Sequence, residues 1–80
     1  MKTNSEKIVE ILKAEVESYV DYDNLDYMAS LTDQGVDSLD FNNVLLVIEE
    51  EYDIEIPDSI IGELDTVNAL VIYINSRTSA

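Results

Sequence analysis

Residues 35–58 read GVDSLDFNNVLLVIEEEYDIEIPD, and this stretch decides the fold of the chain. Apolar side chains recur in it three or four residues apart, which is the period of an amphipathic helix. Asp37 stands where an N-terminal cap is expected, and Asp40 follows three residues later, as in a capping box. Pro57 favours an extended chain after the helix. The stretch therefore predicts a helix over 38–52, with an inner stripe formed by Val44, Leu45, Ile48 and Tyr52.

A first helix is expected before this stretch, over about 5–20, with Ser5 near its cap. Its apolar stripe consists of Ile8, Leu12, Val16 and Tyr19. A polar segment over 21–34 follows this helix, and such a long segment is usually functional or well packed. We expect its apolar residues to hold it against the core, namely Leu25, Met28 and Leu31.

Two further helices are expected after Pro57. Asp58 is placed to cap a short helix over 58–62, which its terminal glycine ends. Asp65 or Thr66 can cap a last helix over 66–75. Together with the two earlier helices, these elements predict an all-α fold, a small four-helix bundle of three main helices and one short helix.

The composition limits what this bundle can do. The 80 residues, which we expect to form one domain over 1–80, contain no cysteine and no histidine. Without these residues there is no imidazole base, thiolate, disulfide or His/Cys metal cluster. An EF-hand-like calcium site from Asp21 is also excluded, because Leu25 and Asp26 stand where a ligand and a glycine are required. The sequence therefore favours a protein that is not an enzyme and holds no dedicated metal.

The charge of the chain points to basic partners. The formal net charge is −14, and no lysine or arginine lies between Lys13 and Arg77. Such a surface repels nucleic acid and anionic membranes and attracts basic protein surfaces. No apolar stretch approaches the roughly 20 residues that span a bilayer. We therefore expect a soluble, cytoplasmic monomer that binds neither nucleic acid nor membrane.

Ser38 is the best indication of function. It begins the helix over 38–52, where free backbone N–H groups and a partial positive charge would stabilise a phosphate ester. One alternative is that Ser38 only caps the helix. Another is phosphorylation, which would add negative charge with no arginine nearby to receive it.

The chain resembles the acyl carrier proteins, the phosphopantetheine-bearing domains of fatty acid, polyketide and related pathways. The resemblance rests on Gly35 to Asp40, on EEEYDIEI over 49–56, and on Pro57 with Asp58. It implies that 4′-phosphopantetheine from coenzyme A is attached to Ser38 by a phosphopantetheinyl transferase that uses magnesium. It further implies a carrier that presents acyl thioesters to a ketosynthase, an acyltransferase and other biosynthetic enzymes with basic surfaces.

Two sets of residues are expected to serve this carrier. Acidic and apolar side chains around the helix over 38–52 would dock the partners, and we assign this role to Asp37, Leu39, Asp40, Leu46, Glu49, Glu50 and Ile56. Aliphatic side chains of the bundle could separate slightly to admit an acyl chain. The candidates for this pocket are Val44, Leu45, Ile48, Ile61, Val67 and Val71.

Four residues depart from the fatty-acid pattern of the family. Asn42 and Asn43 stand where an aliphatic residue and a glutamate are common, Phe41 is bulkier than usual, and Ile72 replaces a residue that is often polar. These departures leave open a general fatty-acid carrier and a specialised carrier for a polyketide, lipid-modification or aminoacyl pathway. An alternative of another class is an unmodified acidic module that covers the basic surface of a partner.

Overall fold

Three α-helices and one longer 3₁₀ helix form the fold in the computed structural model, which describes residues 2–78. The α-helices are α1 (Ser5–Glu15), α2 (Ser38–Tyr52) and α3 (Val67–Arg77), and the 3₁₀ helix is η3 (Asp58–Leu64). Two single-turn 3₁₀ helices, η1 (Tyr22–Asn24) and η2 (Thr32–Gln34), lie in the segment between α1 and α2. Residues 2–78 contain no strand, so the predicted small all-α bundle is confirmed.

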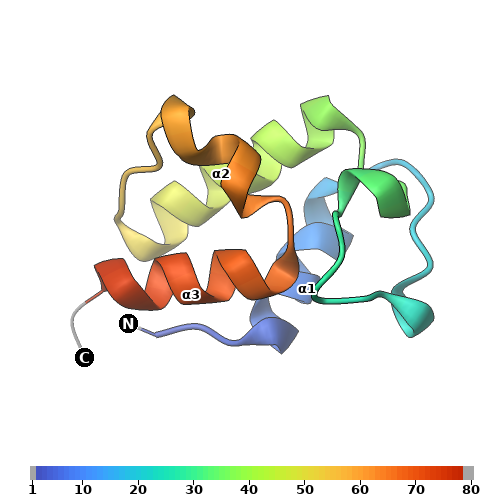
Figure 1. The fold of residues 1–80 in the computed structure, drawn as a ribbon, viewed down its shortest axis with the longest axis horizontal. Coiled ribbons are helices and arrows are strands. Elements are labelled where there is room, and N and C mark those ends of the chain that lie inside the picture. The colour runs from blue at the N-terminus through green and yellow to red at the C-terminus, as the bar shows by residue number, and fades with distance from the viewer. Residues whose placement is uncertain (1, 79–80) are drawn as a thin grey trace.

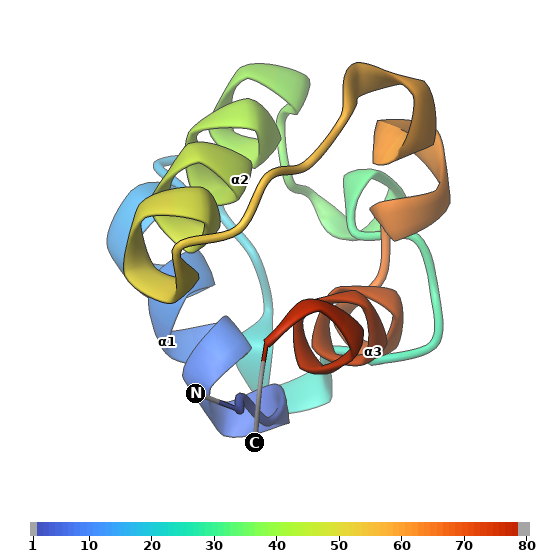
Figure 2. The ribbon, with the colours of Figure 1, turned by 90° about the vertical axis from the view of Figure 1, so that its left-hand side faces the viewer.

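The four longer helices surround one apolar centre. Figure 2 shows α2 and η3 in the upper half of the molecule and α1 and α3 below them. In Figure 1, η3 is the orange helix that crosses α2 in the view, above the red α3. Helix α2 occupies the range that the sequence predicts, because its apolar period, its cap at Asp37 and the later Pro57 all indicate the same element.

Helix α1 is shorter than expected, and the prediction of a helix over 5–20 is wrong at its end. The helix stops at Glu15, and Val16 is extended, with φ −89° and ψ 120°. Beyond this point, Val16 and Val20 are buried, whereas the Tyr19 side chain is 84% exposed and does not belong to the core stripe. At the other end, the side chain of Asn4, not that of Ser5, caps the helix by accepting a hydrogen bond from the Lys7 N–H at 3.0 Å.

The short helix also differs from its prediction. It continues through Gly62 to Leu64, whose buried side chain packs into the core, so glycine does not end it. Asp58 is its first residue and makes no capping hydrogen bond. Of the two caps proposed for the last helix, Thr66 is the one used, because its hydroxyl accepts from the Ala69 N–H at 2.9 Å. Helix α3 runs two residues past the predicted range of 66–75.

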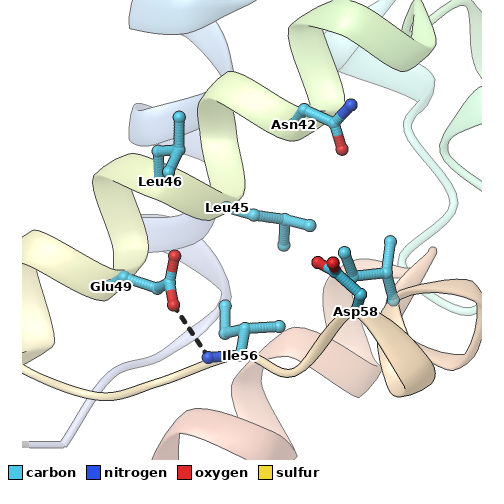
Figure 3. Close-up of a pocket in the computed structure, with 7 residues that line it drawn as sticks. Asn42, Leu45, Leu46, Glu49, Ile56 and Asp58 are labelled. Carbon is cyan, nitrogen blue, oxygen red and sulfur yellow. Dashed lines mark hydrogen bonds between the residues drawn. The ribbon is translucent and has the colours of Figure 1, made fainter.

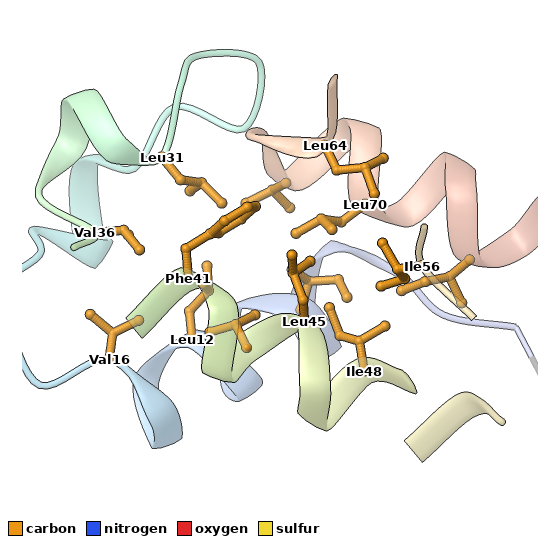
Figure 4. Close-up of a cluster of buried hydrophobic side chains, with 14 of the residues drawn as sticks. Leu12, Val16, Leu31, Val36, Phe41, Leu45, Ile48, Ile56, Leu64 and Leu70 are labelled. Atoms are coloured by element: carbon orange, nitrogen blue, oxygen red, sulfur yellow. The ribbon is translucent and has the colours of Figure 1, made fainter. Parts of the chain in front are cut away.

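The core is mostly aliphatic and includes Phe41, which Figure 4 shows projecting from α2 between Leu31 and Leu70. Leu31 holds the segment before α2 in place, since its side chain is fully buried and its N–H donates to the Asp65 carbonyl oxygen at 2.7 Å. Leu25 packs against the core as expected. Met28 does not, because its side chain is 70% exposed.

Candidate functional site

Ser38 lies exposed as the first residue of α2, and Asp37 performs the capping. The Asp37 side chain accepts a hydrogen bond from the Leu39 N–H at 2.8 Å, and its carbonyl oxygen accepts from the Phe41 N–H at 2.8 Å. Among the residues that the structure describes, no hydrogen bond is formed by the Ser38 hydroxyl. The interpretation of Ser38 as a simple cap is therefore wrong. Its hydroxyl is free and accessible beside the positive end of a helix.

A sharp turn at Gly35 brings the chain to Ser38. Gly35 has φ +110°, a conformation that residues with a Cβ rarely adopt. A Cβ at this position would also lie 2.6 Å from the backbone oxygen of Tyr19. The Ser18 hydroxyl donates to the Gly35 carbonyl oxygen at 2.7 Å. The extended segment after α1 is therefore packed directly against the turn that leads to Ser38.

Asp40 holds the same segment in place. One of its carboxylate oxygens accepts from the backbone N–H of Glu17 at 3.2 Å, so it does not complete a capping box with Asp37. The Asp40 charge also acts on Tyr22: burial raises the pKa of the Tyr22 hydroxyl above its ordinary value, and Asp40 adds to the rise. Asp40 thus joins the start of α2 to the chain after α1, in addition to any role toward partners.

The outer face of α2 carries a stripe of exposed residues beside Ser38. Residues separated by four, seven and eleven positions share one face of a helix. Here this face consists of Leu39, Asn43, Leu46 and Glu50. Leu39 is 73% exposed and Leu46 is 56% exposed. The structure therefore brings three of the predicted docking residues together, with the exposed Asn43 between them.

A cavity of about 270 Å³ lies between α2 and the segment leading into η3. Figure 3 shows Leu45 and Ile56 at its base, with Asn42 and Asp58 at its opening. The remaining lining residues are Leu46, Glu49 and Ile61. A carboxylate oxygen of Glu49 accepts from the Ile56 N–H at 2.9 Å, and this bond closes one end of the cavity.

Two of the predicted docking residues therefore lie outside the exposed stripe on α2. Glu49 joins α2 to the following segment, and Ile56 is buried, so neither belongs to the exposed stripe. Of the six pocket candidates, only Leu45 and Ile61 line this cavity. Val44, Ile48 and Val67 are fully buried in the core, and Val71 packs against it from α3. The sequence identifies Asn42 only as a departure from a pattern, and the fold places this residue at the cavity.

The hydrogen bond from Ile56 to Glu49 gives a testable difference between neighbouring glutamates. We expect Glu49→Ala to lower the free energy of unfolding by about 1–2 kcal/mol, because the partly buried Ile56 N–H loses its acceptor. Glu49→Gln keeps an acceptor oxygen, so its free energy of unfolding should fall by less than half as much. Glu50→Ala, one residue along on the exposed face, is the matched control and should change the stability by less than about 0.5 kcal/mol. Urea unfolding of the three variants measures these effects; equal losses at positions 49 and 50 would show that the bond to Ile56 contributes nothing.

No group of three or more metal-ligating side chains that could hold a metal ion occurs within residues 2–78. In the same part of the chain, no helix is both long enough and apolar enough to cross a bilayer.

Comparison with known proteins gives a matching family and a similar protein. The chain matches the family described as "Phosphopantetheine attachment site" over residues 6–74. It is similar to the protein named "Acyl carrier protein, mitochondrial" from Saccharomyces cerevisiae, with 52% identity over 48 residues. This match covers 60% of the chain and 38% of that relative, so the chain matches less than half the length of the yeast protein.

Proposed function

Since this chain belongs to the acyl carrier protein family, whose prosthetic group is 4′-phosphopantetheine, we propose that Ser38 is the residue that carries this group. The protein is then a carrier and not an enzyme, and other proteins perform the chemistry. The arm supplies the thiol that the chain lacks, and acyl groups are held on it as thioesters. We propose that the chain presents these acyl groups to enzymes of fatty acid synthesis or of a related pathway.

The observation that carries this proposal is the free hydroxyl of Ser38 at the start of α2. A phosphodiester formed there would lie beside the N-terminal N–H groups of a helix, which favour negative charge. Asp37 already caps the helix, so esterification of Ser38 would not remove a cap. The exposed position leaves room for a long substituent. The residues present therefore fit the group.

The charge of the chain supports the class of partner. The proposed partners are a phosphopantetheinyl transferase, a ketosynthase and an acyltransferase with basic surfaces. Opposite charges accelerate the encounter of two proteins, and apolar side chains then bury surface in the complex. The exposed stripe on α2 offers both, with Leu39 and Leu46 as apolar contacts and Glu50 as an exposed charge.

A more specialised carrier is the second candidate, and two residues of α2 favour it. Asn42 replaces an aliphatic residue of the family pattern, and Asn43 replaces a glutamate. The unmodified acidic module is not favoured, because it gives no role to Ser38. Intact mass spectrometry after incubation with coenzyme A, magnesium and a phosphopantetheinyl transferase tests the proposed function.

Substitution of Asn43 tests whether charges on the exposed stripe of α2 speed the association with basic partners. We expect Asn43→Glu to speed association with a basic ketosynthase by up to about fivefold at low salt, because it adds a charge to the exposed stripe. Glu50→Gln removes one charge from the same face and should slow association. Both effects should shrink as salt is added, since ions screen exposed charges. Stopped-flow rates for the phosphopantetheine-bearing proteins decide the matter: rates that do not respond to either change would exclude steering by this face.

A further inference from the structure

Asn42 is one of the polar residues at the opening of a cavity whose base is apolar. Leu45, Ile56 and Ile61 supply the apolar surface, and the first two of these side chains are buried. Asn42 and Asp58 lie exposed at the opening. Figure 3 shows the amide of Asn42 and the carboxylate of Asp58 at the mouth of the cavity, on either side of the Leu45 side chain.

The cavity follows Ser38 along one face of α2. Asn42 is four residues after Ser38, and Leu45 is seven residues after it, so the three side chains share one helical face. A rise of about 1.5 Å per residue puts Asn42 about 6 Å and Leu45 about 10 Å from Ser38 along the axis. Asn42, at the opening, is therefore the cavity residue of α2 that lies nearest to Ser38 along the helix.

The polar groups at this opening have unused hydrogen-bonding capacity. Within residues 2–78, no hydrogen bond involves the side chain of Asn42 or that of Asp58, whereas Glu49 already accepts from the Ile56 N–H. An amide offers two donors and an acceptor, and a carboxylate offers acceptors only. An unsubstituted acyl chain that covered the Asn42 amide would take water from it without replacing the hydrogen bonds of that water, which is unfavourable.

A hydroxyl group matches the Asn42 side chain. It can accept a hydrogen bond from the Asn42 amide N–H or donate one to the Asn42 amide oxygen. We infer that Asn42 is a specificity-determining residue, which makes the cavity prefer an acyl group that bears a hydroxyl over an unsubstituted acyl group of equal length. The volume of about 270 Å³ is just below the range of about 300–1,000 Å³ that is typical of ligand pockets, so the cavity suits a short acyl group. This inference rests on the proposed function of Ser38.

The test uses the full chain loaded at Ser38 with either hexanoyl or 3-hydroxyhexanoyl phosphopantetheine. Two readouts are measured: the NMR shift of the Asn42 side-chain amide, and the rate at which hydroxylamine cleaves the thioester. We expect the hydroxylated group alone to shift the Asn42 amide resonances. We also expect hydroxylamine to cleave the thioester of the hydroxylated group about fivefold more slowly than that of the hexanoyl group, because the hydroxylated group is held in the cavity.

Substitutions at two neighbouring positions separate specificity from general stability. Asn42→Leu should reverse the order, so that the hexanoyl group becomes the better protected one. Asn43→Leu changes the adjacent exposed residue, which does not line the cavity, and should keep the wild-type order. Asn42→Ala provides a second variant, in which the preference for the hydroxyl should disappear without a new apolar contact.

The outcomes distinguish this inference from the proposed function. If mass spectrometry shows no loading at Ser38, the proposed function and the inference both fail. If Ser38 is loaded and the two acyl groups are equally protected, or if Asn42→Leu keeps the wild-type order, the inference alone is overturned.

Discussion

Ser38→Ala is expected to abolish the addition of phosphopantetheine completely, since no other hydroxyl can replace the one at the start of α2. In the wild type, incubation with coenzyme A, magnesium and a permissive phosphopantetheinyl transferase should add one phosphopantetheine to the chain. The variant should keep the wild-type helicity, because the capping bonds belong to Asp37 and the Ser38 side chain is exposed. The stability should change by less than about 0.5 kcal/mol. Intact mass spectrometry measures the addition of phosphopantetheine. Circular dichroism measures the helicity and, followed through unfolding, the stability.

Ser59→Ala is the matched control for this experiment. Ser59 is also exposed and lies near the start of a helix, in η3, but outside the α2 site. This variant should accept the group as the wild type does. Addition to Ser38→Ala, or a wild type that remains unmodified with several transferases, would refute the assignment of the site.

The sequence predicts the parts of the fold whose signals are local. Helix α2 is predicted correctly because its apolar period, the acceptor side chain of Asp37 and the following proline lie within one continuous stretch. The exposure of Leu39 and Leu46 follows from the same period, since both residues fall outside the buried stripe. The end of α1 cannot be obtained in this way. Val16 continues the apolar period, yet the chain leaves the helix there, and the Glu17 N–H bonds to Asp40 on α2.

At the candidate site, too, local sequence signals do not predict the role of every residue. Glu49 and Glu50 are adjacent glutamates, and nothing local indicates that only Glu49 lies within hydrogen-bonding distance of the Ile56 N–H. Met28 and Leu31 are both apolar residues in a polar segment, but only Leu31 lies where its backbone can bond to Asp65 while its side chain enters the core. In each case a partner distant in the sequence decides the role of the residue, and only the folded chain identifies that partner.

Gly35→Ala is expected to be strongly destabilising, because two independent conditions at this position require glycine. The φ of +110° is unfavourable for any residue with a Cβ. In addition, the new Cβ would lie 2.6 Å from the Tyr19 backbone oxygen, so the backbone after α1 would have to move. We expect a loss of about 2–4 kcal/mol. For a domain of 80 residues, whose stability is typically about 4–12 kcal/mol, this loss should lower the melting temperature by about 10–25 °C.

The other glycine of the chain provides the control for this substitution. Gly62, in η3, does not have a positive φ, and no atom lies within 4 Å of the position that a Cβ would take. Gly62→Ala should therefore leave the stability unchanged or raise it by up to about 1 kcal/mol, because alanine has less freedom to lose on folding. Thermal unfolding of both variants makes the comparison.

Since the Gly35 turn carries the bond from Ser18 and leads directly to Ser38, Gly35→Ala should also accept phosphopantetheine more slowly at temperatures where it remains folded. Equal melting temperatures for Gly35→Ala and the wild type would show that the segment after α1 can move at no cost, and that the turn does not fix the position of Ser38.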